Sequence, residues 1–93
     1  MIAVSELTQS FEVAPVYRLE SAEQALALLN PIRAEILRLL GEPSSASEIG
    51  RKIGETPQKV NYHLKMLEKV GLVRRSGTRQ VKNLVEVLYL AVA

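Results

Sequence analysis

The run Gly54-Glu55-Thr56-Pro57 separates two stretches of helical spacing, and this junction constrains the fold more than any other feature. Glycine permits a left-handed turn, threonine can cap a helix, and proline suits the first helical position. Before the junction, Ser45 and Glu48 form the capping-box pattern of a helix expected at residues 45–53. A longer helix is expected at residues 57–70. Two helices joined by a three-residue turn that contains glycine form a helix-turn-helix.

Apolar residues on these two helices recur at spacings of three, four and seven, which places them on one buried face. Gly50 supplies the small residue that a close crossing of the helices requires. The second helix buries a branched residue six positions after the turn glycine. The pattern therefore predicts a shared core formed by Ile49, Ile53, Val60, Leu64 and Leu67.

Similar start and stop signals bound the rest of the chain. Ser21 and Gln24 form a reciprocal capping pair at the start of a first helix. Asn30 caps a second helix that begins at Pro31, and Gly41 offers that helix a left-handed exit. The remaining expected elements are an alternating strand at residues 11–19, helices at 21–29 and 31–40, and strands at 72–75 and 81–92 joined by a polar turn at 76–80.

This order of elements predicts a mostly α fold with a small β-hairpin, a winged helix-turn-helix, with an additional N-terminal strand as an optional element. Residues 1–20 are expected to form an N-terminal arm that carries the edge strand. Residues 21–93 are expected to form the winged helix-turn-helix domain. A chain of 93 residues with 47% hydrophobic and 24% charged residues suits one small soluble domain.

The residue content excludes several classes of function. The chain has no cysteine, so it can form no disulfide, thiolate metal site or thiol nucleophile. One histidine cannot assemble a metal site or a catalytic pair, and we expect neither enzyme activity nor a cofactor. We expect His63 to be half-buried in packing, with pH sensing as the alternative. Since no apolar run reaches the about 18 residues of a membrane span and no signal peptide is present, we expect a cytoplasmic protein.

Charge is distributed unevenly along the chain. Residues 1–48 hold seven acidic and three basic residues, a net charge of −4, whereas residues 49–93 hold nine basic and three acidic residues, a net charge of +6. A basic surface attracts nucleic acid and is held to it by counterion release. The C-terminal half is therefore expected to face a polyanion, and a solvated basic surface is the alternative.

The polar face of the helix at residues 57–70 carries side chains suited to DNA. Gln and Asn can pair with adenine edges, Lys can reach guanine or phosphate, and a tyrosine hydroxyl can contact either. A merely solvated face would explain the lysines but less readily an exposed tyrosine beside asparagine. The predicted contact residues are Gln58, Lys59, Asn61, Tyr62 and Lys65.

Cations also gather on the hairpin, where they can straddle the DNA backbone or enter a minor groove. Solubilising charge on an edge hairpin is the competing interpretation. Ser47 and Arg51 lie near the start of the helix at residues 45–53, where a phosphate is favoured, and are candidates for positioning it; Ser45 is already explained as a cap. The hairpin candidates are Arg74, Arg75, Arg79 and Lys82.

Residues 30–37, 47–49 and 60–73, the last reading VNYHLKMLEKVGLV, resemble the ArsR-type winged helix-turn-helix repressors. The resemblance extends over most of the chain. It implies a homodimeric transcription factor that binds a pseudo-palindromic operator in double-stranded DNA. It also implies a recognition helix at residues 57–70 in the major groove and a wing at residues 72–85.

The chain departs from that family in two respects. Metal-sensing members carry cysteine ligands on the helix equivalent to residues 45–53, so metal sensing is not expected here. Members usually place another, dimer-forming helix after the wing, and here the chain ends at Ala93. The protein is therefore expected to dimerise through its N-terminal strand or first helix, or to be the DNA-binding part of a longer regulator. The last strand, apolar on both faces, favours a partner surface.

Together these features predict sequence-specific binding of double-stranded DNA by a transcriptional regulator, expected to be a repressor, with the wing on the backbone or in the minor groove. A winged-helix module that binds another protein is the alternative of a different class. Binding of single-stranded RNA is disfavoured because aromatic residues, which form stacking platforms, are only 4% of the chain.

Overall fold

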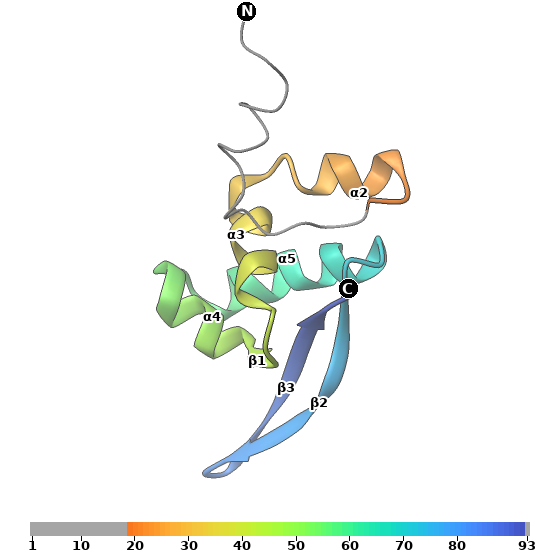
Figure 1. Cartoon of the computed structure of the whole chain (residues 1–93). Helices are drawn as coiled ribbons and strands as arrows, with labels where there is room; N and C mark the ends of the chain where they lie inside the picture. The colour runs from red at the N-terminus through yellow and green to blue at the C-terminus, as the bar shows by residue number, and fades with distance from the viewer. Residues whose placement is uncertain (1–18, 93) are drawn as a thin grey trace, which may run out of the picture.

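The computed structural model describes residues 19–92, which form four helices and a three-stranded antiparallel sheet (Figure 1). This arrangement confirms the expected winged helix-turn-helix. All but the last two residues of the predicted N-terminal arm at 1–20, and all but the last residue of the predicted strand at 11–19, lie outside the described residues. In chain order the elements are α2 (Ala22–Ala27), α3 (Pro31–Leu39), β1 (Ser44–Ser45), α4 (Ala46–Ile53), α5 (Pro57–Lys69), β2 (Val73–Val81) and β3 (Leu84–Ala91).

The helix starts follow the capping signals of the sequence. Asn30 Oδ1 accepts the backbone N–H groups of Ile32 at 2.9 Å and Arg33 at 3.3 Å. Both halves of the capping box between Ser45 and Glu48 are present, each at 3.1 Å. These contacts satisfy backbone donors that a helix leaves unpaired at its start. They therefore confirm the predicted beginnings of α3 and α4.

Two other predicted helix-boundary signals are wrong in part or in full. Ser21 caps α2 as predicted, because its hydroxyl accepts the N–H of Gln24 at 3.2 Å. The Gln24 side chain does not return the bond to Ser21: its oxygen accepts the N–H of Glu20 at 2.6 Å, and its amide donates to the carbonyl of Val70 at 2.9 Å. The side chain is used to join α2 to the end of α5 instead. Gly41 does not adopt a positive φ; α3 ends at Leu39, and its C-cap Leu40 has a φ of −94°.

The sheet contains a strand that the sequence did not indicate. β1 pairs antiparallel with β3, with Ser44 opposite Tyr89 and Ser45 opposite Leu88, and β3 lies between β1 and β2. β1 leads directly into α4, because Ser45 is both the last strand residue and the N-cap of the helix. The base of the hairpin is therefore hydrogen-bonded to the segment that starts the helix-turn-helix.

The hairpin turn lies later than predicted. Residues 76–80, expected to be a polar turn, belong to β2, and the turn falls at Lys82 and Asn83 between the paired residues Val81 and Leu84. Every residue of β2 after Val73 is exposed, so polar side chains are as suitable for this strand as for a turn. The polar composition of residues 76–80 therefore does not distinguish the two. The resulting ribbon projects away from the helices, which makes a longer wing than the sequence predicted (Figure 1).

The core lies between the helices and the base of the sheet. Val60, Leu64 and Leu67 on α5 are fully buried, as is Ile49 on α4. Ile53, predicted for the same core, is only half-buried and packs against its edge. The inward face of α5 is thus fixed by packing, which leaves its opposite face to solvent. In the described part of the chain, no helix is both long enough and apolar enough to span a membrane.

Candidate nucleic-acid interface

The outward face of α5 presents every residue that the sequence assigned to it. Because Val60, His63 and Leu64 are buried, the side chains on the opposite side of the helix turn to solvent. Tyr62 is 59% exposed, which is unusual for a large aromatic side chain. The exposed residues of this face are Gln58, Lys59, Asn61, Tyr62 and Lys65.

A buried polar link holds this helix against the preceding ones. His63 on α5 is only 5% exposed, deeper than the half-burial predicted. Its Nδ1 accepts a hydrogen bond from Arg33 Nε at 3.2 Å, and Arg33 Nη1 donates to the carbonyl of Ala27 at 3.4 Å. The imidazole also meets the ring of Tyr62 edge to face, with centroids 5.2 Å apart. Arg33 on α3 thereby connects the end of α2 with His63 of α5, whose ring contacts the exposed Tyr62.

We expect this link to make stability depend on pH. Burial, followed by the positive charges of Arg33 and Lys59, lowers the pKa of His63 below 6.5, against a smaller opposing effect of Glu55. The unfolded chain therefore takes up a proton more readily, and the free energy of unfolding should fall as the pH drops below about 6.5. Urea titrations between pH 7.5 and 5.5 measure this fall. His63→Gln should flatten the dependence in this window, and an unchanged slope in that variant would contradict the assignment.

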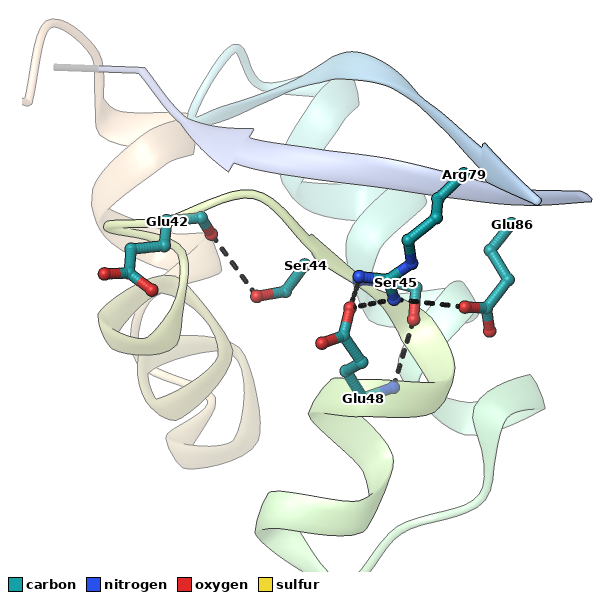
Figure 2. A network of polar contacts seen from close by, with 6 residues as sticks. All are labelled: Glu42, Ser44, Ser45, Glu48, Arg79 and Glu86. Carbon is teal, nitrogen blue, oxygen red and sulfur yellow. Dashed lines mark hydrogen bonds and ion pairs between the residues drawn. The ribbon is translucent and has the colours of Figure 1, made fainter. Parts of the chain in front are cut away.

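Arg79 on the wing is engaged by two carboxylates. Its Nη2 lies 2.5 Å from Glu48 Oε1 on α4 and 3.2 Å from Glu86 Oε1 on β3 (Figure 2). The hydrogen bond from the backbone N–H of Ser45, followed by that from Arg79, lowers the pKa of Glu48. Glu48, followed by Glu86, raises the pKa of Arg79. This predicted contact residue is therefore committed to an internal network that the sequence did not reveal.

Two other predicted contact residues also have acidic neighbours. Arg75 Nε lies 3.2 Å from Glu68, and Lys59 Nζ lies 3.5 Å from Glu55. Both pairs are partly exposed, and such pairs are weak and easily exchanged. Among residues 19–92, no acidic group lies within ion-pair distance of the remaining predicted cations, Arg51, Lys65, Arg74 and Lys82.

At the start of α4, Ser45 has the capping role that the sequence predicted. Ser45 is buried and its hydroxyl accepts the N–H of Glu48, so it serves as a cap. Ser47 is half-buried and Arg51 is exposed. Both remain on the surface of α4, but only Ser47 lies beside the first turn of α5, in the cleft described next.

A cleft of about 310 Å³ separates the starts of α4 and α5 from β3. Ser47, Pro57 and Asn61 contribute to its helical side, and Leu84, Glu86 and Val87 to its wing side. The sequence predicted a partner surface from the apolar residues of the last strand and did not indicate this cleft; of those residues, Leu84 is 71% and Val85 65% exposed. The structure thus brings Asn61 and Ser47 opposite the wing, in a space that is open to solvent.

Comparison with known proteins agrees with this geometry. A family model described as a helix-turn-helix domain matches residues 28–76, from the end of α2 into the wing. No curated protein sequence gives a significant match.

Several solved structures have a similar fold. An ArsR-like transcriptional regulator from Rhodococcus sp. RHA1 is 33% identical, with a TM-score of 0.58 over 76% of this chain and 66% of that one. The homodimeric winged helix-turn-helix DNA-binding domain of a possible ArsR-family regulator from Mycobacterium bovis is 21% identical, with a TM-score of 0.61 over 97% and 72%. The transcriptional repressor BigR from Xylella fastidiosa is 20% identical, with a TM-score of 0.62 over 100% and 83%.

The family match covers more than half of the chain and spans the two helices, the turn between them and the start of the wing. The solved structures extend the similarity to the complete wing. The chain therefore belongs to the helix-turn-helix domain family and has the winged fold of the ArsR-type regulators.

Proposed function

We propose that the protein is a transcriptional regulator that binds specific sequences of double-stranded DNA. The observation that carries this proposal is the outward face of α5, whose five polar and aromatic side chains are exposed beside the wing. An α-helix of this kind fits the major groove of B-DNA, where base edges are distinguishable. The ArsR-like regulator from Rhodococcus, 33% identical, supports the same role.

Within this interface, the side chains divide into two groups. Gln58 and Asn61 lie on the first turns of α5 and would read base edges, since their amides can pair with adenine. Lys59 and Lys65 would hold phosphate, and Tyr62 would contact backbone or base. On the wing, Arg74 and Lys82 have no acidic neighbour among the described residues and would contact the backbone or the minor groove. Arg75 would do so after release from Glu68, and Ser47 and Arg51 would position a phosphate.

A homodimer would place two copies of α5 on successive turns of a pseudo-palindromic site, about 34 Å apart. The domain from Mycobacterium bovis is homodimeric. In this chain, α2 lies on the side of the molecule away from the wing tip (Figure 1). Leu26 on α2 is 64% exposed, and Leu29 beyond its end is 76% exposed. Exposed leucines of this size favour a protein contact. They support dimerisation through the first described helix, with both wings directed to DNA.

Binding of such a dimer within a promoter would exclude the transcription machinery, and repression by occlusion is therefore the proposed mode of action. BigR, which has the same fold, is a transcriptional repressor. We infer that the protein acts by binding and not by catalysis, and that it does so in the cytoplasm, where a prokaryotic operator is accessible.

Titration of a fluorescent random-sequence duplex at several salt concentrations tests the proposal. Affinity should fall linearly on a log–log plot, because each phosphate contact releases counterions. Lys65→Ala should weaken binding to all sequences and reduce the slope by about one. After selection of an operator, Asn61→Ala should relax the preference at one or two base pairs, at about 1 to 3 kcal/mol.

Arg38→Ala is the matched control for loss of a cation, because Arg38 lies on α3 and pairs with Glu35 there. It should leave DNA binding unchanged. If the wild-type protein ignores DNA at low salt although it is folded and dimeric, the protein-interaction alternative takes precedence. If Lys65→Ala and Asn61→Ala give the same uniform loss, the division into base-reading and phosphate-holding residues is wrong.

A further inference from the structure

Arg79 and Glu86 are direct cross-strand partners in the wing, so their side chains project from the same face of the ribbon. From this position the guanidinium also reaches Glu48 in the first turn of α4 (Figure 2). Glu48 is held by the backbone N–H of Ser45, which donates to the same carboxylate oxygen at 3.1 Å. One cation therefore joins the middle of the wing to the start of the helix-turn-helix.

The net charge of this network disfavours DNA binding. It contains two carboxylates and one guanidinium, a net charge of −1, and Glu86 lines the cleft that also contains Ser47 and Asn61. A phosphate that enters this region meets two negative charges, while the best donor for it is already occupied. No described acidic group lies within ion-pair distance of Arg74 or Lys82, so a phosphate beside them meets no such repulsion.

The network is nevertheless suited to exchange. The side chains of Arg79, Glu48 and Glu86 are 43%, 26% and 20% exposed, so water reaches all three groups and each pair contributes little. Arginine binds phosphate in the same forked geometry as carboxylate. A phosphate of the DNA backbone can therefore take the place of Glu86 at the guanidinium without a buried charge being left unpaired.

We propose that Glu86 is a negative determinant of DNA affinity: it holds Arg79 inside the free protein, and DNA binding requires that Arg79 exchange this carboxylate for a phosphate. The inference rests on the proposed DNA-binding function. Glu48 contributes to the same restraint but stays in place through its cap, so Glu86 is the partner that is released. Because Arg79 must first give up its contact with Glu86, it contributes less to DNA affinity than a free arginine at the same position would.

Glu86→Gln tests the proposal on the full chain. The Glu86 carboxylate makes no other hydrogen bond or ion pair with the residues that the structure describes, so the substitution removes only its part of the restraint on Arg79. In low salt we expect binding of a random-sequence duplex to tighten about two- to fivefold, the range that an exposed ion pair accounts for. Glu35→Gln, which removes an exposed ion-pair partner on α3, should leave affinity unchanged.

An Arg79→Ala background separates exchange from general repulsion. If Arg79 is the group released, Glu86→Gln should tighten binding less in that background than in the wild type, and thermal unfolding monitored by circular dichroism should confirm that all variants fold. An equal gain in affinity in both backgrounds would overturn the proposed exchange. Weaker binding of Glu86→Gln would also overturn it, because it would mean that the network is needed to hold the wing in place. Failure of the wild-type protein to bind any duplex would instead reject the proposed function, and this inference with it.

Discussion

Replacing Leu64 by alanine is expected to lower the free energy of unfolding by about 3 to 5 kcal/mol, the upper part of the range for deletion of a buried leucine side chain. Leu64 is fully buried in the middle of α5, within the core that also contains Ile36, Ile49 and Tyr89. Packing from α3, α4 and the sheet limits how far the site can collapse around the missing atoms. A loss of this size removes much of the stability of a small domain.

The adjacent Lys65 provides the matched control, because the two positions differ in the direction of their side chains. Lys65 is exposed, and its replacement by alanine should change stability by less than about 0.5 kcal/mol while it weakens DNA binding. Urea unfolding and duplex titration of both variants measure the two effects. A stable Leu64→Ala variant would mean that α5 is not held by this core, and its outward face would then have no fixed orientation.

The helices could be predicted from the sequence because their boundaries depend on neighbouring residues. The capping box of Ser45 and Glu48 involves residues three apart, and Thr56 accepts the N–H of Lys59 at the same separation. Gly54 takes the left-handed conformation that the turn requires, with a φ of 72°. The outward face of α5 could be predicted directly from the helical spacing of its apolar residues. Local chemistry and tertiary packing agree in this part of the chain.

The sheet was harder to predict because its pairing is distant in sequence. β1 consists of two serines, which have no strand signal of their own and pair only because Tyr89 and Leu88 lie beside them. In β2 the alternation that marks a half-buried strand is missing, since its residues after Val73 are exposed on both faces. The polar composition of residues 76–80 therefore predicts a turn, although these residues belong to β2.

The polar contacts of the candidate site also join residues that are distant in sequence, so they could not be predicted from it. Positive charge on the wing was evident from the sequence, but the position of Arg79 between Glu48 and Glu86 depends on how the wing folds back toward α4. The amide of Gln24 likewise finds its partner at Val70, on another helix. Counting charges along the chain predicts a basic surface and cannot show which of its cations are already engaged.

Gly50→Ala is expected to destabilise the domain by about 2 to 3 kcal/mol, as overpacking of a close contact does. A Cβ atom at this position would lie 2.5 Å from the carbonyl oxygen of Glu55, which belongs to the backbone and cannot rotate away. The N–H of Glu55 also donates to the carbonyl of Gly50 at 2.9 Å, so the turn is tied to the helix where the clash arises. The sequence predicted a small residue here for a helix crossing, whereas the close neighbour is the turn itself.

Gly41→Ala is the control, since no atom lies within 4 Å of an added Cβ and φ is not positive there. It should leave the free energy of unfolding unchanged or raise it by up to about 1 kcal/mol, because alanine restricts the unfolded chain. The turn after Gly50 sets the angle at which α5 leaves α4, so Gly50→Ala should also weaken operator binding under conditions where the variant remains folded. Equal stability of the two variants would show that the turn can shift to admit a methyl group, and the orientation of α5 would then depend on its core contacts alone.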